Sequence, residues 1–139
     1  MLSANDIHHI VGLLYAATGD LAKVVSLGEK VWDAASRTKR DVDVVILTAG
    51  STAMIAAEVK HEQRRLDVAL VEGLCLKFID MPSITDRNIV SSSGFTKPAV
   101  AKARKHGVRS LTLRRGPLRH LGNIDISRLT EIEYVAPIH

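Results

Sequence analysis

The sequence predicts an α/β domain built on a mixed β-sheet. Three observations support this class. Short β-prone runs follow one another closely in the first half of the chain, two amphipathic helical patterns separate the later runs, and 46% of the 139 residues are hydrophobic. Neighbouring runs can pair as antiparallel strands, whereas parallel strands need a crossover connection that is usually helical. We therefore expect residues 1–139 to form a single domain with one core.

The first expected elements are a helix and a hairpin. Ser3 begins a capping-box spacing, apolar residues then recur at the helical period, and Gly19 can end the helix. β-branched runs at residues 23–27 and 30–33 flank a Gly-Glu pair, which indicates a hairpin that turns at that pair. Residues 34–40 are expected to form a polar loop.

A second hairpin is expected in the middle of the chain. Residues 42–48 and 52–59 are strongly β-prone, and only Ala49, Gly50 and Ser51 separate them. Glycine at the first central position suits a two-residue type II′ turn. We therefore expect Gly50 and Ser51 to form the turn.

Helices and strands alternate in the second half of the chain. Asp67 is expected to begin an amphipathic helix that ends before Pro82. Thr96 can cap another helix, whose end is marked by Gly107. From residue 114 to 139 the pattern weakens into a C-terminal tail or edge element. Short strands are expected at residues 88–92, 108–113 and 132–135.

Composition and charge indicate the compartment and the kind of partner that we expect for the protein. The chain has 19 Lys and Arg against 15 Asp and Glu, a net charge of +4, which favours a polyanionic partner without deciding it. Cys75 is the single cysteine, so neither a disulfide framework nor a cysteine-based zinc site is suggested. The sequence has no apolar run of about 18 residues and no signal-peptide pattern. We expect a cytoplasmic protein without a membrane partner.

The second expected hairpin brings charged residues to one face. If the Gly-Ser pair forms the turn, Asp43 lies opposite Glu58, and Asp41 lies opposite Lys60. Because side chains alternate along a strand, these four residues share a face. The opposite face then carries apolar residues that point toward a second packed layer: Val44, Ile46, Ile55, Ala57 and Val59.

Two directly opposed carboxylates need a compensating cation. Like charges at paired positions destabilise a sheet, and Mg²⁺, or Mn²⁺ in its place, suits carboxylate ligands. We therefore predict a metal site at Asp43 and Glu58. Lys60 could orient the attacking water or stabilise charge on a phosphate, so the predicted reaction is phosphodiester hydrolysis. The competing interpretation is an ordinary charged strand end, because a Glu-x-Lys triplet alone is common.

Three segments resemble a known nuclease family. RDVDVV at residues 40–45, EVK at 58–60 and IVSSSGFTKPA at 89–99 are similar to the Mrr-like branch of the PD-(D/E)xK restriction endonuclease superfamily. The resemblance covers about residues 38–113. It implies a restriction-endonuclease-like fold of three layers, α/β/α, with a central mixed sheet flanked by helices.

The resemblance also implies an activity and its residues. Members of this family cut DNA with a divalent metal, and their cleavage site corresponds to Asp43, Glu58 and Lys60 in this sequence. Asp41 precedes the strand and is an accessory acid that could share or replace the role of Asp43. Family members often carry a separate domain that selects the DNA, and 139 residues leave little room for one. An additional recognition domain or protein is therefore expected.

Two groups of residues could contact DNA. The Ser-rich turn at 91–97 precedes a helix, where backbone N–H groups can hold a phosphate, so Thr96 or Lys97 could touch the DNA backbone. Arg64 and Arg65 follow the Glu-x-Lys strand. The competing interpretations are a capped turn and a solvated loop. A wider basic cluster could line a DNA path or form a solvated face: Lys97, Lys102, Arg104, Lys105, Arg109, Arg114 and Arg115.

Three functions compete. The leading prediction is a metal-dependent DNA endonuclease of the restriction or defence type, acting as a homodimer if it makes double-strand breaks. The second is a non-cleaving DNA-binding or assembly module within a larger protein, although such a role gives no reason to keep opposed carboxylates. The third is a small-molecule phosphate binder that uses the Ser-rich turn, which would be indifferent to changes at Glu58.

Overall fold

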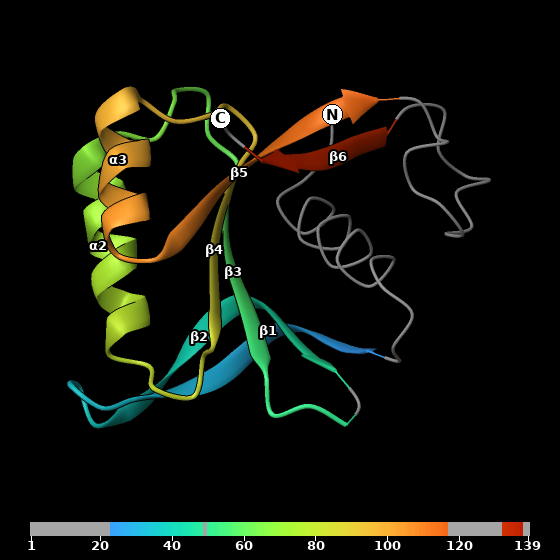
Figure 1. Cartoon of the computed structure of the whole chain (residues 1–139), viewed down its shortest axis with the longest axis vertical. Helices are drawn as coiled ribbons and strands as arrows, with labels where there is room; N and C mark the ends of the chain where they lie inside the picture. Colours follow the sequence, from blue (N-terminus) through green and yellow to red (C-terminus); the bar gives the residue numbers. More distant parts are fainter. Residues whose placement is uncertain (1–22, 49, 117–131, 138–139) are drawn as a thin grey trace.

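The described part of the chain forms one β-sheet with two helices (Figure 1). The computed structural model describes residues 23–48, 50–116 and 132–137. The helix expected from Ser3 to Gly19 lies outside these residues. The elements are β1 (Lys23–Asp33), β2 (Thr38–Thr48), β3 (Met54–Lys60), α2 (Val68–Ile79), β4 (Asp86–Ser91), α3 (Lys97–Lys105), β5 (Val108–Gly116) and β6 (Ile132–Pro137).

The six strands of the described residues lie in the sheet in the order of the sequence. β1–β2, β2–β3 and β5–β6 are antiparallel, whereas β3–β4 and β4–β5 are parallel. α2 and α3 form the crossovers between the parallel strands, as that direction requires. Both helices cover the same face of the sheet and contact each other (Figure 1). The predicted α/β class with a mixed sheet is confirmed.

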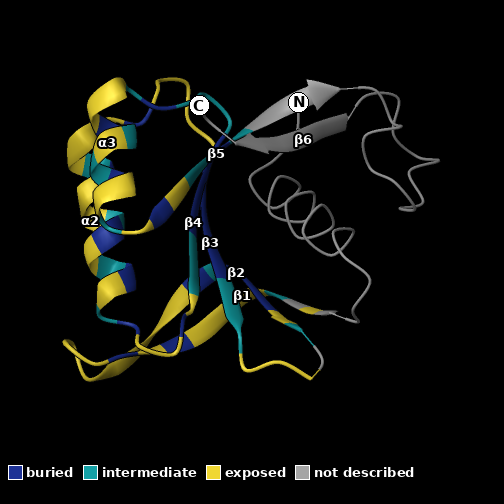
Figure 2. Ribbon diagram, in the orientation of Figure 1, coloured by how far each residue is buried: buried dark blue, intermediate teal, exposed yellow. Residues whose placement is uncertain are grey.

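The core lies between the two helices and the sheet. The sides of the helices that face the sheet are buried and the opposite sides are exposed (Figure 2). Phe78 on α2 is fully buried and is among the largest side chains of the core. Cys75 is also buried, which agrees with a packing role. Other members are Val71, Ala99 and Ala103 on the helices and Val45, Ala56 and Ile89 on the strands.

The helices and the later strands follow the predicted signals. Asp67 caps α2 by accepting a hydrogen bond from Leu70 N at 2.9 Å. Gly107, with a φ of +67°, follows the end of α3. The strands predicted at 88–92, 108–113 and 132–135 correspond to β4, β5 and β6, and β6 forms the edge of the sheet. Neither helix of the described residues is long and apolar enough to cross a membrane.

The first hairpin turns later in the chain than predicted. β1 is one strand that continues through Gly28, where φ is +70°, and it pairs with β2 on both sides of that glycine. The tip of the hairpin is formed by residues 34–37. Asp33 fixes this tip, because its Oδ1 accepts hydrogen bonds from the backbone N–H groups of Ala35 and Ser36, both at 2.9 Å. The predicted turn at the Gly-Glu pair was therefore wrong, and the predicted loop at residues 34–40 is confirmed for 34–37 only, because 38–40 belong to β2.

The second hairpin has the predicted register. Its pairs run from Val44 opposite Ala57 to Leu47 opposite Met54. This alignment is the one expected if the turn were centred on the Gly-Ser pair. The two predicted metal ligands, Asp43 and Glu58, lie one position beyond the last of these pairs, toward the open end of the hairpin.

The turn of this hairpin differs from the prediction. Ser51 N donates to Thr48 O at 3.2 Å, which makes Gly50 the third residue of the turn. The φ of Gly50 is +74°, in the left-handed region that glycine adopts readily. Pairing with β2 begins only at Met54, whose N–H donates to Thr85 Oγ1 at 2.9 Å. The predicted two-residue turn was therefore wrong, because residues 51–53 lie outside the strands and β3 begins at Met54.

Candidate active site

Asp43 lies at the point where β2 leaves β3. The backbone pairs between the two strands end at Val44 and Ala57. One residue further along, Asp43 Oδ2 accepts a hydrogen bond from Val59 N at 2.8 Å. The Asp43 side chain thus takes the place of a backbone acceptor for the Val59 N–H group. Beyond this point β2 remains paired with β1. The Asp43 carboxylate is therefore fixed to β3 next to Glu58.

Glu58 is a buried acid in β3. Its side chain is 5% exposed, and its Oε1 atom lies 2.7 Å from Lys77 Nζ on α2. Burial raises the pKa of the Glu58 carboxyl to about 7; the charge and hydrogen bonding of Asp43 also raise this pKa, and Lys77 opposes them. At neutral pH the Glu58 carboxyl is therefore only partly ionised, and a further positive charge nearby would favour its ionised form.

This pair of carboxyl groups fits a divalent cation. Glu58 Oε1 is buried and accepts no well-aligned hydrogen bond among the described residues, although the Lys77 ammonium, which donates to Asp41 O, lies 2.7 Å away. Asp43 and Glu58 are the residues that would hold Mg²⁺, which usually keeps several waters and uses one or two protein carboxylates. The described residues contain no cluster of three or more His, Cys, Asp or Glu side chains.

Lys60 lies two residues beyond Glu58, at the end of β3. Side chains two residues apart on a strand point to the same face. Lys60 is aligned with Ser91 on β4 and is partly exposed, whereas Glu58 is buried. The structure therefore brings Asp43, Glu58 and Lys60 to one face of adjoining strands, with Lys60 at the end that is open to solvent.

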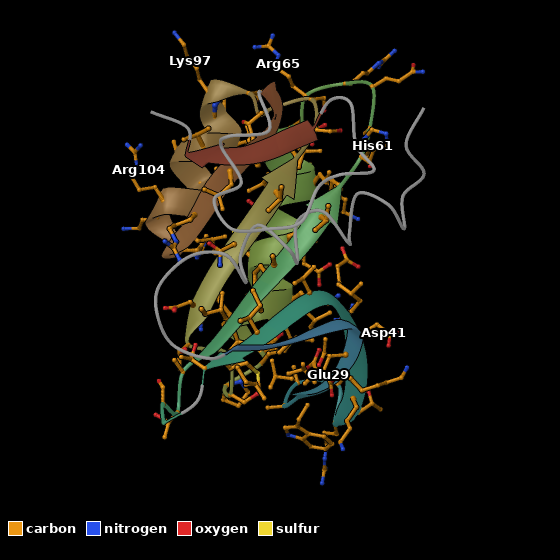
Figure 3. All side chains as sticks on the ribbon, turned by 90° about the vertical axis from the view of Figure 1, so that its right-hand side faces the viewer. Glu29, Asp41, His61, Arg65, Lys97 and Arg104 are labelled. Atoms are coloured by element: carbon orange, nitrogen blue, oxygen red, sulfur yellow. The ribbon has the colours of Figure 1, made fainter. Side chains whose placement is uncertain are left out.

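Asp41 lies on the β1–β2 hairpin, where it is paired with Lys30 (Figure 3). Asp41 Oδ1 forms an ion pair with Lys30 Nζ at 2.9 Å, and the two side chains are 65% and 64% exposed. The predicted opposition of Asp41 and Lys60 was wrong, because the pairing of β2 with β3 has already ended. The backbone oxygen of Asp41, and not its carboxylate, is connected to the site through Lys77.

Lys77 is a residue of the site that the sequence did not reveal. Its side chain is 16% exposed and bridges Glu58 Oε1 and Asp41 O, with both distances 2.7 Å. The end of α2 is tied to the hairpin tip, because Ala34 N donates to Asp80 O at 2.7 Å. This contact positions the last turn of α2 over the two strands. The only feature of the sequence that could have indicated this role is that Lys77 is a single lysine beside the apolar stripe of the helix.

The Ser-rich turn is closed by its own hydrogen bonds. Ser91 Oγ accepts from Ser93 N at 3.2 Å and from Gly94 N at 3.0 Å. Ser93 Oγ donates to Arg64 O at 2.6 Å. Thr96 accepts from the N–H of Ala99 at 3.3 Å and so caps α3. Thr96 therefore caps the helix as the capped-turn interpretation expected, and the N–H groups of Ser93 and Gly94 are engaged within the turn.

Three exposed basic side chains surround this turn: Arg64, Arg65 and Lys97. The loop after β3 and the loop before α3 are joined through Leu66, whose N–H and C=O form backbone hydrogen bonds of 2.9 and 3.0 Å with the second loop. Arg65 and Lys97 consequently project from the same end of the molecule (Figure 3). This is the end at which β3 finishes, so the basic side chains and the open end of the site are on the same side.

Comparisons with known proteins identify the fold. No family of known proteins and no curated protein matches the sequence. The structure is similar to a protein of unknown function, AF1548, with a TM-score of 0.60 and 17% identity over 74% of this chain and 54% of that one. It is also similar to a repair endonuclease from Pyrococcus abyssi, with a TM-score of 0.55 and 14% identity over 79% of this chain and 46% of that one.

The chain has a nuclease-like fold. At these identities the likeness shows the fold alone, and it confirms the predicted restriction-endonuclease-like fold class. It does not distinguish the Mrr-like branch from others. The chain spans about half the length of the two solved structures that it matches.

Proposed function

We propose that this protein is a metal-dependent DNA endonuclease with its active site at Asp43, Glu58 and Lys60. The observation that carries the proposal is the Asp43–Glu58 pair. Asp43 is held at the open end of the β2–β3 hairpin by its hydrogen bond from Val59 N. Glu58 is buried beside it and has a pKa of about 7. Burying like charges is costly unless a cation compensates them. The likeness to a repair endonuclease supports the nuclease class.

The chemistry follows from the donor set. Mg²⁺, with Mn²⁺ as a substitute, would be held by Asp43 and Glu58 and would polarise the scissile phosphate. Lys60 lies on the same face at the solvent-accessible end, where an ammonium can orient the attacking water or stabilise negative charge on the phosphate. The exposed side chains of Arg64, Arg65 and Lys97 are suited to hold the DNA backbone.

The biological setting is part of the proposal. The resemblance to Mrr-like enzymes favours restriction or defence in the cytoplasm, and the likeness to a repair endonuclease makes DNA repair the alternative. A homodimer is expected if the enzyme makes double-strand breaks. The resemblance to Mrr-like enzymes also leads us to expect a further domain or protein that selects the DNA.

The test is cleavage of supercoiled plasmid, methylated and unmethylated, and of mismatched duplexes, with Mg²⁺, Mn²⁺ or a chelator. We expect metal-dependent cleavage that falls at least about a hundredfold in Glu58→Gln and in Lys60→Ala, as expected when one electrostatic group of an active site is lost. Glu62→Gln, a change at an exposed acid beyond the strand, is the matched control. Cleavage unchanged in both site variants, or none by the folded protein, would favour the non-cleaving DNA-binding or assembly module.

A further inference from the structure

The Lys77 ammonium neutralises part of the charge of the candidate active site. It lies 2.7 Å from Glu58 Oε1, and both side chains are largely shielded from water. Glu58 Oε1 accepts no well-aligned hydrogen bond among the described residues, so the contact between these two groups is an ion pair. The aligned hydrogen bond of Lys77 goes to the backbone oxygen of Asp41. The ammonium is therefore anchored to the hairpin and presented to the acid.

This arrangement lets Lys77 release Glu58 without losing its own hydrogen bond. A cation held by a single charged partner would be left uncompensated if that partner were taken away. The hydrogen bond from Lys77 to the Asp41 carbonyl, at 2.7 Å, does not involve Glu58. The side chain also lies in the last turn of α2, where the helix dipole favours a positive charge.

A divalent ion at the two carboxylates would compete with this ammonium. Glu58 faces the ammonium with one oxygen and is coupled to Asp43 by charge and by hydrogen bonding. An ion bound to both acids would lie within a few ångströms of Lys77, and two positive charges that close repel each other, as like charges do at any shared site. The Lys77 ammonium and the metal ion therefore compete for close contact with the Glu58 carboxylate.

We infer that Lys77 is an internal counter-ion of the Asp43–Glu58 pair, which stabilises the metal-free protein and is displaced from Glu58 when a divalent cation binds. This inference rests on the proposed function, because it concerns the same site. Its consequence is that Lys77 opposes metal binding. Removal of its charge should therefore tighten metal binding while it weakens the metal-free fold, a combination that a purely structural residue would not produce.

The experiment compares Lys77→Met with Lys102→Met in the full chain. Lys102 is the matched control, because it pairs with Glu72 on the helical surface at 2.8 Å with both side chains more than a third exposed. We expect Lys77→Met to unfold at a lower urea concentration without metal and to bind Mg²⁺ about tenfold more tightly by calorimetry, the size of effect that a nearby charge has on a proton equilibrium. Lys102→Met should leave Mg²⁺ affinity unchanged.

A measurement on the native protein covers the case in which Lys77→Met does not fold without metal. Lysine side-chain ¹⁵N–¹H spectra should show one protected ammonium signal, absent from a Lys77→Arg sample, and this signal should shift and lose protection when Mg²⁺ is added. A signal unaffected by saturating Mg²⁺, or weaker Mg²⁺ binding by Lys77→Met, would overturn the counter-ion role.

The two proposals fail in different ways. If the native protein and Glu58→Gln bind Mg²⁺ equally, the proposed metal site is wrong and the counter-ion inference falls with it. If Glu58→Gln loses Mg²⁺ binding while Lys77→Met binds Mg²⁺ no more tightly than the native protein, the metal site stands and only the role of Lys77 is wrong.

Discussion

At the level of single residues, the burial of Glu58 makes folding depend on pH. Its pKa in the folded protein is about 7, above the ordinary value of 4.5, so the native state holds a proton that the unfolded chain has already lost. This contribution to stability is fully present below about pH 4.5 and is lost as the pH rises to about 7. A pKa shift of this size changes the free energy of unfolding by roughly 3 kcal/mol between the two ends of this pH range.

The native protein loses this contribution as the pH rises, whereas Glu58→Gln has no carboxyl group to lose it. We therefore expect the free energy of unfolding of Glu58→Gln to rise relative to that of the native protein from pH 5 to pH 8. The measurement is the free energy of unfolding from urea titrations across this range. Glu62→Gln, which changes an exposed acid, should follow the native curve. Parallel curves for Glu58→Gln and the native protein would show that Glu58 holds no proton in the native state at neutral pH.

The sequence predicted the two acids of the site but not the lysine that faces them. Asp43 and Glu58 belong to neighbouring strands of one hairpin, so their alignment follows from period and register alone. Lys77 reaches them from α2, and its direction depends on how the helix packs on the sheet. Asp41 was misplaced because strand pairing ended early, when the side chain of Asp43 took over a backbone hydrogen bond.

At the level of secondary-structure elements, the N-terminus of α3 links stability to the proposed DNA surface. Thr96 caps the helix, and Lys97 follows it at the end where Arg65 projects. We expect Thr96→Ala to lower the free energy of unfolding by about 1 kcal/mol, the usual value of a lost cap. Thr96→Asp should keep the stability, because Asp is as good a cap, but should weaken DNA binding by charge repulsion.

Urea titration and fluorescence anisotropy with labelled duplex DNA measure the two effects separately. Undiminished DNA binding by a stable Thr96→Asp protein would place the DNA away from this end of the molecule. Loss of DNA binding in Thr96→Ala alone would instead indicate a direct contact of the hydroxyl with DNA.

Local signals located most elements and misplaced two turns. The caps at Asp67 and Thr96 acted as predicted, because an N-cap depends on a few consecutive residues. Gly28 looked like a turn but is accommodated inside β1, where pairing on both sides holds the strand together. The tip of the β1–β2 hairpin is instead stabilised by Asp33, whose side chain accepts two backbone hydrogen bonds.

At the level of the whole molecule, the distribution of basic side chains predicts how DNA binding depends on salt. Arg65 and Lys97 project from the end where β3 finishes, whereas Arg104 points away along the flank of α3 (Figure 3). If DNA lies across that end, each phosphate contact contributes about 0.9 to the slope of log affinity against log salt. Arg65→Ala and Lys97→Ala should each lower the slope by about that amount, and Arg104→Ala should not.

The slope is obtained from DNA affinities measured over a series of salt concentrations. A lower slope in Arg104→Ala would move the DNA path onto the outer surface of α3. A slope that none of the three changes affects would remove this group of side chains from the interface.

The overall topology followed from the order of the elements. Every strand of the described residues pairs with its neighbour in the sequence. The antiparallel pairing of β1, β2 and β3 and the parallel pairing of β3, β4 and β5 could be derived from which of these connections contain a helix. The coverage of one face by both helices and the approach of α2 to the hairpin tip could not, because they depend on packing between segments that are distant in the chain.

The same strand order has a consequence for how the protein folds. The β2–β3 hairpin that brings Asp43 to Glu58 is local, and hairpins form within about 1–10 μs. The Lys77 ammonium arrives only when α2 packs on the sheet, a step that involves contacts more distant in the chain. The two acids therefore meet before their counter-ion is in place. The rate at which this chain folds should consequently rise in mild acid or with divalent salt, which supply the missing positive charge during that interval.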